Sequence, residues 1–133
     1  MVGREELNSI TRDVIGAAIE VHRTLGPGLL ESAYQACLVH ELRERGMRVA
    51  EHVPLPVRYK GVQLECGYRL DLLVKDCVVV EVKSVETVLP VHRAQWLSSL
   101  KLSGHRIGLL INLNVRVLKE GVVRMVNGTI STL

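Results

Sequence analysis

Apolar residues follow two different periods along the chain, and the first part of the chain has the helical one. They recur every three or four positions over residues 9–25, the spacing of an amphipathic helix, and Gly26-Pro27-Gly28 is expected to end that helix. The helical period continues over residues 29–45, and Gly46 is a typical helix stop. Because only a short turn joins the two helices, we expect them to form a hairpin.

The next part of the chain has strand-like segments. Apolar and β-branched residues dominate four of them, residues 47–53, 55–59, 62–74 and 77–83. A third helix is predicted over residues 90–102, because Pro90 suits a first turn and Gly104 suits an end. Two further strands are expected at residues 107–112 and 121–126, the second of them at an edge of the sheet.

The order of these elements predicts an α/β domain with a mixed sheet (α+β). The succession of strand, helix and strand is a crossover, which makes the strand at residues 77–83 parallel to the strand at residues 107–112. The remaining neighbours are joined by short turns and are expected to be antiparallel. A chain of 133 residues that is 47% hydrophobic can build one core, so residues 1–133 are predicted to form a single domain.

The charge and the amino-acid composition limit the kinds of partner that the protein is expected to bind. The formal net charge of +3 is compatible with a polyanion but does not require one. Aromatic residues make up only 3% of the chain, so base recognition on an aromatic platform is not expected. No apolar run reaches the roughly 20 residues of a membrane span, and the N-terminal residues have no apolar signal core. The three cysteines lack the spacing of metal ligands. We therefore expect a cytoplasmic protein with reduced thiols and no membrane contact.

Two acidic residues lie inside apolar runs on either side of a predicted turn. Asp71 lies in the run before Lys75-Asp76-Cys77, and Glu81 follows three consecutive valines after it. In a hairpin centred on Asp76 the two acids would be opposite each other, with Cβ atoms roughly 5 Å apart. A three-residue turn, or a two-residue turn with a bulge, keeps them on one face. A plain two-residue turn would put Glu81 on the other face.

The two carboxylates have two explanations. Asp71 could form an ion pair with Arg69 or Lys83, and Lys83 could neutralise Glu81, which lies two residues before it on the same face. Alternatively, Asp71 and Glu81 could hold a divalent cation such as Mg²⁺, which would relieve the repulsion between them. In that case Lys83 would position a water molecule or stabilise charge that develops on a phosphate.

Three further polar residues are candidates for the same site. Glu31 is in the first turn of the second helix, where a carboxylate can also simply complement the helix dipole. Tyr34 is one turn later and could reach the same cleft or pack in the core. Gln95 projects near the direction of Val91 and Leu102 on its helix, so we expect it on the buried side, where its amide needs partners.

Several motifs together resemble a known family. The segment Gly28-Leu29-Leu30-Glu31-Ser32-Ala33-Tyr34 matches the motif of the GxxExxY family. The resemblance extends over nearly the whole chain, through Tyr59-Lys60-Gly61, Leu70-Asp71-Leu72-Leu73-Val74, Glu81-Val82-Lys83, Gln95 and Leu110-Ile111-Asn112-Leu113-Asn114. That family is in turn similar to the PD-(D/E)XK nuclease superfamily.

The resemblance implies a restriction-endonuclease-like core, with a helix, a three-stranded antiparallel meander, a helix and a strand, preceded here by an extra N-terminal helix. It implies a catalytic set of Asp71, Glu81, Lys83, Glu31 and Gln95. It also implies metal ligands from Asp71, Glu81, the main-chain carbonyl of Val82 and Glu31, with Tyr34 behind them. Leu70 stands where the superfamily's name has Pro.

The function expected from the residues and the resemblance is hydrolysis of phosphodiester bonds in nucleic acid, most readily DNA, with Mg²⁺ or Mn²⁺ as cofactor. One alternative is an inactive nuclease-like module that binds nucleic acid or a protein. Another is a structural subunit that dimerises through its apolar surfaces, with the acids in salt bridges. A small nuclease would also gain from forming a homodimer, because one copy grips little duplex.

Overall fold

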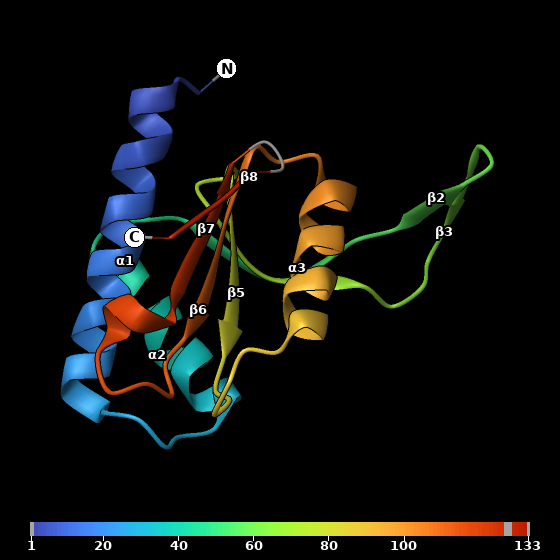
Figure 1. Ribbon diagram of the computed structural model, residues 1–133. Helices are drawn as coiled ribbons and strands as arrows, with labels where there is room; N and C mark the ends of the chain where they lie inside the picture. Colours follow the sequence, from blue (N-terminus) through green and yellow to red (C-terminus); the bar gives the residue numbers. More distant parts are fainter. Residues whose placement is uncertain (1, 127–128, 133) are drawn as a thin grey trace.

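The computed structural model describes residues 2–126 and 129–132 and has the mixed α/β fold expected from the sequence. Figure 1 shows a central sheet with two helices on one face and one helix on the other. In chain order the elements are α1 (Arg4–Leu25), α2 (Glu31–Glu44), β1 (Val49–Pro54), β2 (Val57–Tyr59), β3 (Val62–Leu64), β4 (Arg69–Val74), β5 (Val78–Lys83), α3 (Pro90–Ser103), β6 (Ile107–Asn112), a 3-10 turn η1 (Leu118–Gly121), β7 (Val122–Val126) and β8 (Thr129–Thr132).

The first helix begins about one turn earlier than its sequence pattern predicts. It begins at Arg4, with Gly3 in extended conformation before it. The reason is Leu7, which is 4% exposed and continues the buried row of Ile10 and Val14 toward the N-terminus. Burial of this row against the sheet, rather than the polar cap expected near residue 9, sets the start of the helix.

The sheet has six strands in the order β1-β4-β5-β6-β7-β8. Strands β1, β4 and β5 form an antiparallel meander, and β6 is parallel to β5 through the α3 crossover. The predicted edge position of the strand at residues 121–126 is wrong, because β8 pairs with β7 on its outer side. The predicted long strand over residues 62–74 is in fact two strands, since Gly67, at φ 79°, turns the chain between them.

A short two-stranded ribbon interrupts the meander. Strands β2 and β3 pair only with each other, and Figure 1 shows them projecting past α3 and away from the body of the molecule. The open edge of the main sheet on this side is β1, which contains Glu51, His52 at φ 50° and Pro54.

Two apolar layers cover the sheet. Helices α1 and α2 pack on one face through a large aliphatic cluster that includes Val80, Val82 and Leu109. Helix α3 packs on the other face through Trp96 and Leu100. Among the described residues, no helix combines the length and apolar character of a membrane span.

A close approach of backbones fixes the position of η1 against the end of β6. A Cβ atom added at Gly121 would lie 2.0 Å from the main-chain oxygen of Asn112. No side chain fits there unless one of the two backbone segments moves. Gly121 therefore keeps the C-terminal end of β6 and its polar residue in place.

We expect Gly121→Ala to lower the free energy of unfolding by about 1–3 kcal/mol, because an overpacked position must displace backbone. The matched control is Gly16→Ala in α1, where the added Cβ meets only the end of the Arg45 side chain at 3.2 Å. That change should be neutral or stabilising by up to about 1 kcal/mol. Urea unfolding measures both, and equal effects of the two substitutions would contradict the close-packing explanation.

Candidate metal centre

The β4–β5 hairpin has the register that places two acids on one face. Strand residues pair as Leu72 with Val80, Leu73 with Val79 and Val74 with Val78. This leaves a three-residue turn, in which Lys75 and Asp76 adopt φ values of 51° and 58°. Continuing the same register puts Asp71 opposite Glu81, on the face of the sheet covered by α3 rather than by α1 and α2.

Asp71 is fixed by the main chain of the neighbouring strand. Its Oδ2 accepts a hydrogen bond of 2.9 Å from the backbone N–H of Val82. This bond lies just beyond the last paired residues of the β4–β5 ladder, so the carboxylate takes the place of a main-chain acceptor. The second oxygen of Asp71 is left for another partner.

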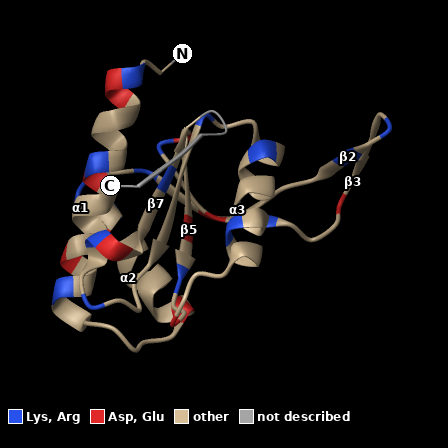
Figure 2. Cartoon of the chain, in the orientation of Figure 1, with Lys and Arg blue, Asp and Glu red and all other residues tan. Residues whose placement is uncertain are grey.

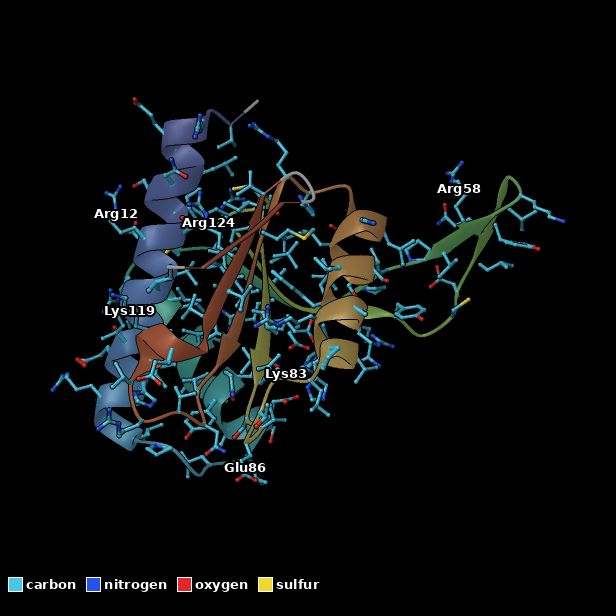
Figure 3. All side chains as sticks on the ribbon, viewed as in Figure 1. Arg12, Arg58, Lys83, Glu86, Lys119 and Arg124 are labelled. Carbon is cyan, nitrogen blue, oxygen red and sulfur yellow. The ribbon has the colours of Figure 1, made fainter. Side chains whose placement is uncertain are left out.

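Lys83 and Glu81 form a loose, largely buried ion pair. The Lys83 Nζ lies 3.9 Å from the Glu81 Oε1, and each side chain is 18% exposed. In Figure 3 the Lys83 side chain lies near the lower end of β5, and Figure 2 shows a basic segment following an acidic one along that strand. The distance is too long for a direct hydrogen bond, so the ammonium group does not fully neutralise Glu81.

The pKa of Glu81 shows that burial and a neighbouring carboxylate disfavour the charged form of this side chain. It is raised from 4.5 to about 7, mainly because burial penalises the charged form and secondly because of repulsion from Asp71. Lys83 opposes this rise, while Glu31 and a hydrogen bond with Asp71 add to it. Near neutral pH the Glu81 carboxyl group is therefore protonated for part of the time, a state that a divalent cation could replace.

The N-terminal end of α2 lies beside the end of β5. Glu31 is the first residue of α2, is exposed, and accepts a 3.3 Å hydrogen bond at Oε1 from the backbone N–H of Ser84. The Ser84 hydroxyl donates to the carbonyl of Leu29 at 2.5 Å. These two bonds join the loop before α2 to the residue after Lys83, which explains how Glu31 comes to act on Glu81.

Tyr34 holds this loop in place through two hydrogen bonds of its hydroxyl group. The side chain is fully buried, its hydroxyl donates to the carbonyl of Gly26 at 2.5 Å, and the N–H of Leu29 donates to the same hydroxyl at 3.2 Å. Both of these bonds go to the loop that precedes Glu31. The two positions expected for Tyr34 are thus both found in part. Its ring packs in the core, and its hydroxyl holds the loop beside the site.

Gln95 is not on the buried side of its helix, contrary to the sequence prediction. It is exposed on α3, as are Val91 (53%) and Leu102 (40%), whose apolar character suggested burial of that face. The sheet is instead contacted by Trp96 and Leu100. Helix α3 has apolar residues on two faces, and the face with the large aromatic side chain of Trp96 packs against the sheet.

Asn112 is a structural residue of the site to which the sequence pattern assigned no role. It is 2% exposed and pairs with Lys83 across the parallel strands β5 and β6. Its side chain accepts from Val85 N–H at 3.1 Å and donates to the Val85 carbonyl at 2.9 Å, and it also accepts from Asn114 N–H. Asn112 therefore holds the chain that leaves Lys83. The signal in the sequence is an amide at the end of the apolar run Ile107–Asn112.

The oxygen atoms present here suit a hard cation that takes part of its coordination shell from water. Within residues 2–126 and 129–132, no three His, Cys, Asp or Glu side chains come close enough to hold an ion together. The site offers two crowded carboxylates, Asp71 and Glu81, and Mg²⁺ is commonly held by one or two carboxylates with waters completing its octahedron. The residues present therefore fit such an ion.

Comparison with known proteins gives one finding. The sequence model of the PD-(D/E)XK nuclease superfamily matches residues 8–125, which extend from within α1 to within β7 and include Glu31, Asp71 and Glu81. No curated protein and no solved structure matches the chain significantly. The finer resemblance to the GxxExxY family stays a prediction. With most of its length matched and the fold in agreement, this chain belongs to the PD-(D/E)XK nuclease superfamily.

Proposed function

We propose that this protein hydrolyses phosphodiester bonds in nucleic acid, with DNA as its main substrate. The observation that carries the proposal is the convergence of Asp71 and Glu81 on one face of the sheet, with the pKa of Glu81 raised to about 7 by burial and by the neighbouring carboxylate. Such a pair is costly unless it binds a proton or a cation. Membership of a nuclease superfamily supports the choice of reaction.

In this proposal Asp71, Glu81 and the main-chain carbonyl of Val82 hold Mg²⁺ or Mn²⁺. The ion would polarise the phosphate and lower the pKa of a bound water. Asp71 is already oriented by its hydrogen bond to Val82 N–H, so little rearrangement is needed on that side. Glu31 adds negative charge from the end of α2 and is proposed to contact the ion through its water shell.

Lys83 is proposed to stabilise charge on the reacting phosphate. Its ammonium group is largely buried and only loosely paired with Glu81, at 3.9 Å, so it can turn toward an incoming anion. The hydrogen bonds of Asn112 to Val85 would keep the chain that follows Lys83 in position. Gln95 is exposed on α3, and a direct role would require the substrate to pass over that helix.

The cytoplasm is the proposed location, and free Cys37, Cys66 and Cys77 are compatible with its reducing conditions. The net charge of +3 supports association with a polyanion but does not distinguish DNA from RNA.

We expect Asp71→Asn to reduce Mg²⁺- or Mn²⁺-dependent cleavage of DNA by at least about 100-fold, because it removes a charged ligand that supports several kcal/mol of transition-state stabilisation. The matched control is Glu86→Gln, which neutralises an exposed acid three residues after Lys83, labelled in Figure 3. A panel of single- and double-stranded DNA and RNA substrates, assayed with both ions and with EDTA, measures the effect.

Equal cleavage by wild type and Asp71→Asn would show that the activity comes from a contaminant. Tight binding of nucleic acid by the wild type without cleavage under any of these conditions would favour the inactive binding module instead.

The raised pKa of Glu81 predicts a stability that depends on pH in the absence of metal. Between about pH 4.5 and 7 the folded protein binds more protons than the unfolded chain, so stability is full below this range and falls as pH rises through it. We expect Glu81→Gln to be more stable than wild type at pH 8 in EDTA, by roughly 1–3 kcal/mol, and to lose this advantage near pH 4.5.

Addition of Mn²⁺ at pH 8 should raise the melting temperature of the wild type but not that of Glu81→Gln, because only the wild type retains both carboxylates. Glu86→Gln should behave as wild type in both measurements. A Glu81→Gln protein that is less stable than wild type at pH 8 in EDTA would contradict the crowding of charge at this site.

A further inference from the structure

Two neighbouring hollows lie between the N-terminal half of α1 and the strands β6 and β7. The larger has a volume of about 500 Å³, and its lining includes Arg4, Arg106 and Arg124. The smaller, of about 290 Å³, has Arg12 in its lining and shares Asn8 and Arg124 with the larger. No Asp or Glu of the described residues lines either hollow, so both have only positive charge in their walls.

Arg124 is the residue on which both hollows depend. It pairs with Leu109 on the α1 face of the sheet and is only partly exposed. Its guanidinium group donates to Oδ1 of Asn8, which is neutral, and its enclosed Nε has no hydrogen-bond acceptor among the described residues. None of the ion pairs of the described chain includes Arg124. Because arginine keeps its charge in proteins, this cation is partly withdrawn from water without a counter-ion.

Three further arginines bring positive charge to the same place. Arg4, Arg12 and Arg106 are exposed, and none of them takes part in an ion pair with a described carboxylate. Arg106 is held by a 3.1 Å hydrogen bond from its Nη1 to the carbonyl of Val2. Arg4 and Arg12 are separated by roughly 12 Å along the axis of α1 and by about 80° around it. A ligand that reaches all of these groups must therefore be longer than a single phosphate ion.

We propose that the two hollows form a second binding site, which holds a chain of phosphate groups with Arg124 at its centre. The planar guanidinium group suits phosphate oxygens, because it donates two parallel hydrogen bonds to them. The described lining contains no aromatic side chain on which a base could stack, so the site is expected to bind phosphates without reading bases. A nucleic-acid strand and a free polyphosphate both present this chemistry.

This site is distinct from the candidate metal centre. Ile107, in the lining of the larger hollow, pairs with the first residue of β5, whereas Lys83 is its last, which separates them by roughly 17 Å along the strand. The acids of the metal centre lie on the α3 face of the sheet, and Arg124 lies on the α1 face. Figure 3 shows Arg12 and Arg124 beside the upper half of α1, away from Lys83. Binding at this site can therefore be measured without the metal centre.

Binding measurements in EDTA test the proposal, with tripolyphosphate in calorimetry and a short labelled DNA strand in fluorescence anisotropy. We expect Arg4→Gln/Arg12→Gln to weaken the binding of at least one probe by about 10-fold or more, because two charge-assisted contacts are lost. If the ligand is a strand, the slope of log K against log salt should also fall by about 1.4, since each contact contributes about 0.7.

The matched control is Arg23→Gln/Arg43→Gln. It removes the same charge from two exposed arginines that already have carboxylate partners, Glu20 and Glu51, so it should change either affinity by less than about 2-fold. Circular dichroism should show unchanged folding for both double variants, because all four positions are exposed.

Arg124→Gln tests the centre of the site. Tripolyphosphate should raise the melting temperature of the wild type but not that of Arg124→Gln, because a ligand stabilises only the form that binds it. Should Arg124→Gln fail to fold, the comparison of the two double variants still decides.

A loss with tripolyphosphate alone identifies a free polyphosphate as the ligand, whereas a loss that includes the DNA strand identifies nucleic acid. A wild type that binds neither probe at about 1 mM overturns the proposal. So does Arg4→Gln/Arg12→Gln binding both probes as the wild type does, or an equal loss with the control variant. None of these outcomes depends on cleavage, so they are separate from a failure of the metal centre.

Discussion

The three-residue turn between β4 and β5 is the constraint on which the candidate site depends. It sets a register in which Asp71 and Glu81 share one face of a sheet that is buried on both sides. A slip of β5 by one residue would move Glu81 into the aliphatic layer under α1 and α2, away from Asp71, and would turn Val78, Val80 and Val82 toward α3. Packing of Val78, Val80 and Val82 against that layer thus stabilises the fold and the crowding of the carboxylates together.

The surroundings of the hairpin hold its polar end by main-chain contacts. Asp71 is bound by Val82 N–H, Glu31 by Ser84 N–H, and Asn112 by both polar groups of the Val85 main chain. Backbone partners of this kind leave the carboxylates few rotamers, which favours a site that is formed before a ligand arrives. In the metal-free protein this arrangement destabilises the charged form of Glu81, which raises the pKa of its carboxyl group.

The sequence alone predicts the position of a residue in the fold where that position follows from local periodicity. The strands of the hairpin and the parallel crossover come from runs of β-branched residues, and the opposition of Asp71 to Glu81 follows once the turn length is known. The start of α1 could not be predicted in the same way, because it depends on the fit of Leu7 to a distant surface. Gln95 was placed on the wrong side because α3 has two apolar faces, and only tertiary packing decides that Trp96 takes the inner one. The importance of Asn112 depends on the path of another loop, which no local pattern contains.

The open edge at β1 has a consequence for how copies of this chain can meet. An exposed edge strand offers unpaired main-chain groups that can template further strands and start fibril growth. Here Pro54 lacks an N–H group, His52 has its backbone in the left-handed region, and Glu51 brings a charge, so the regular ladder needed for strand addition is interrupted. Association through side chains remains open to the protein, while uncontrolled sheet extension on this side is disfavoured.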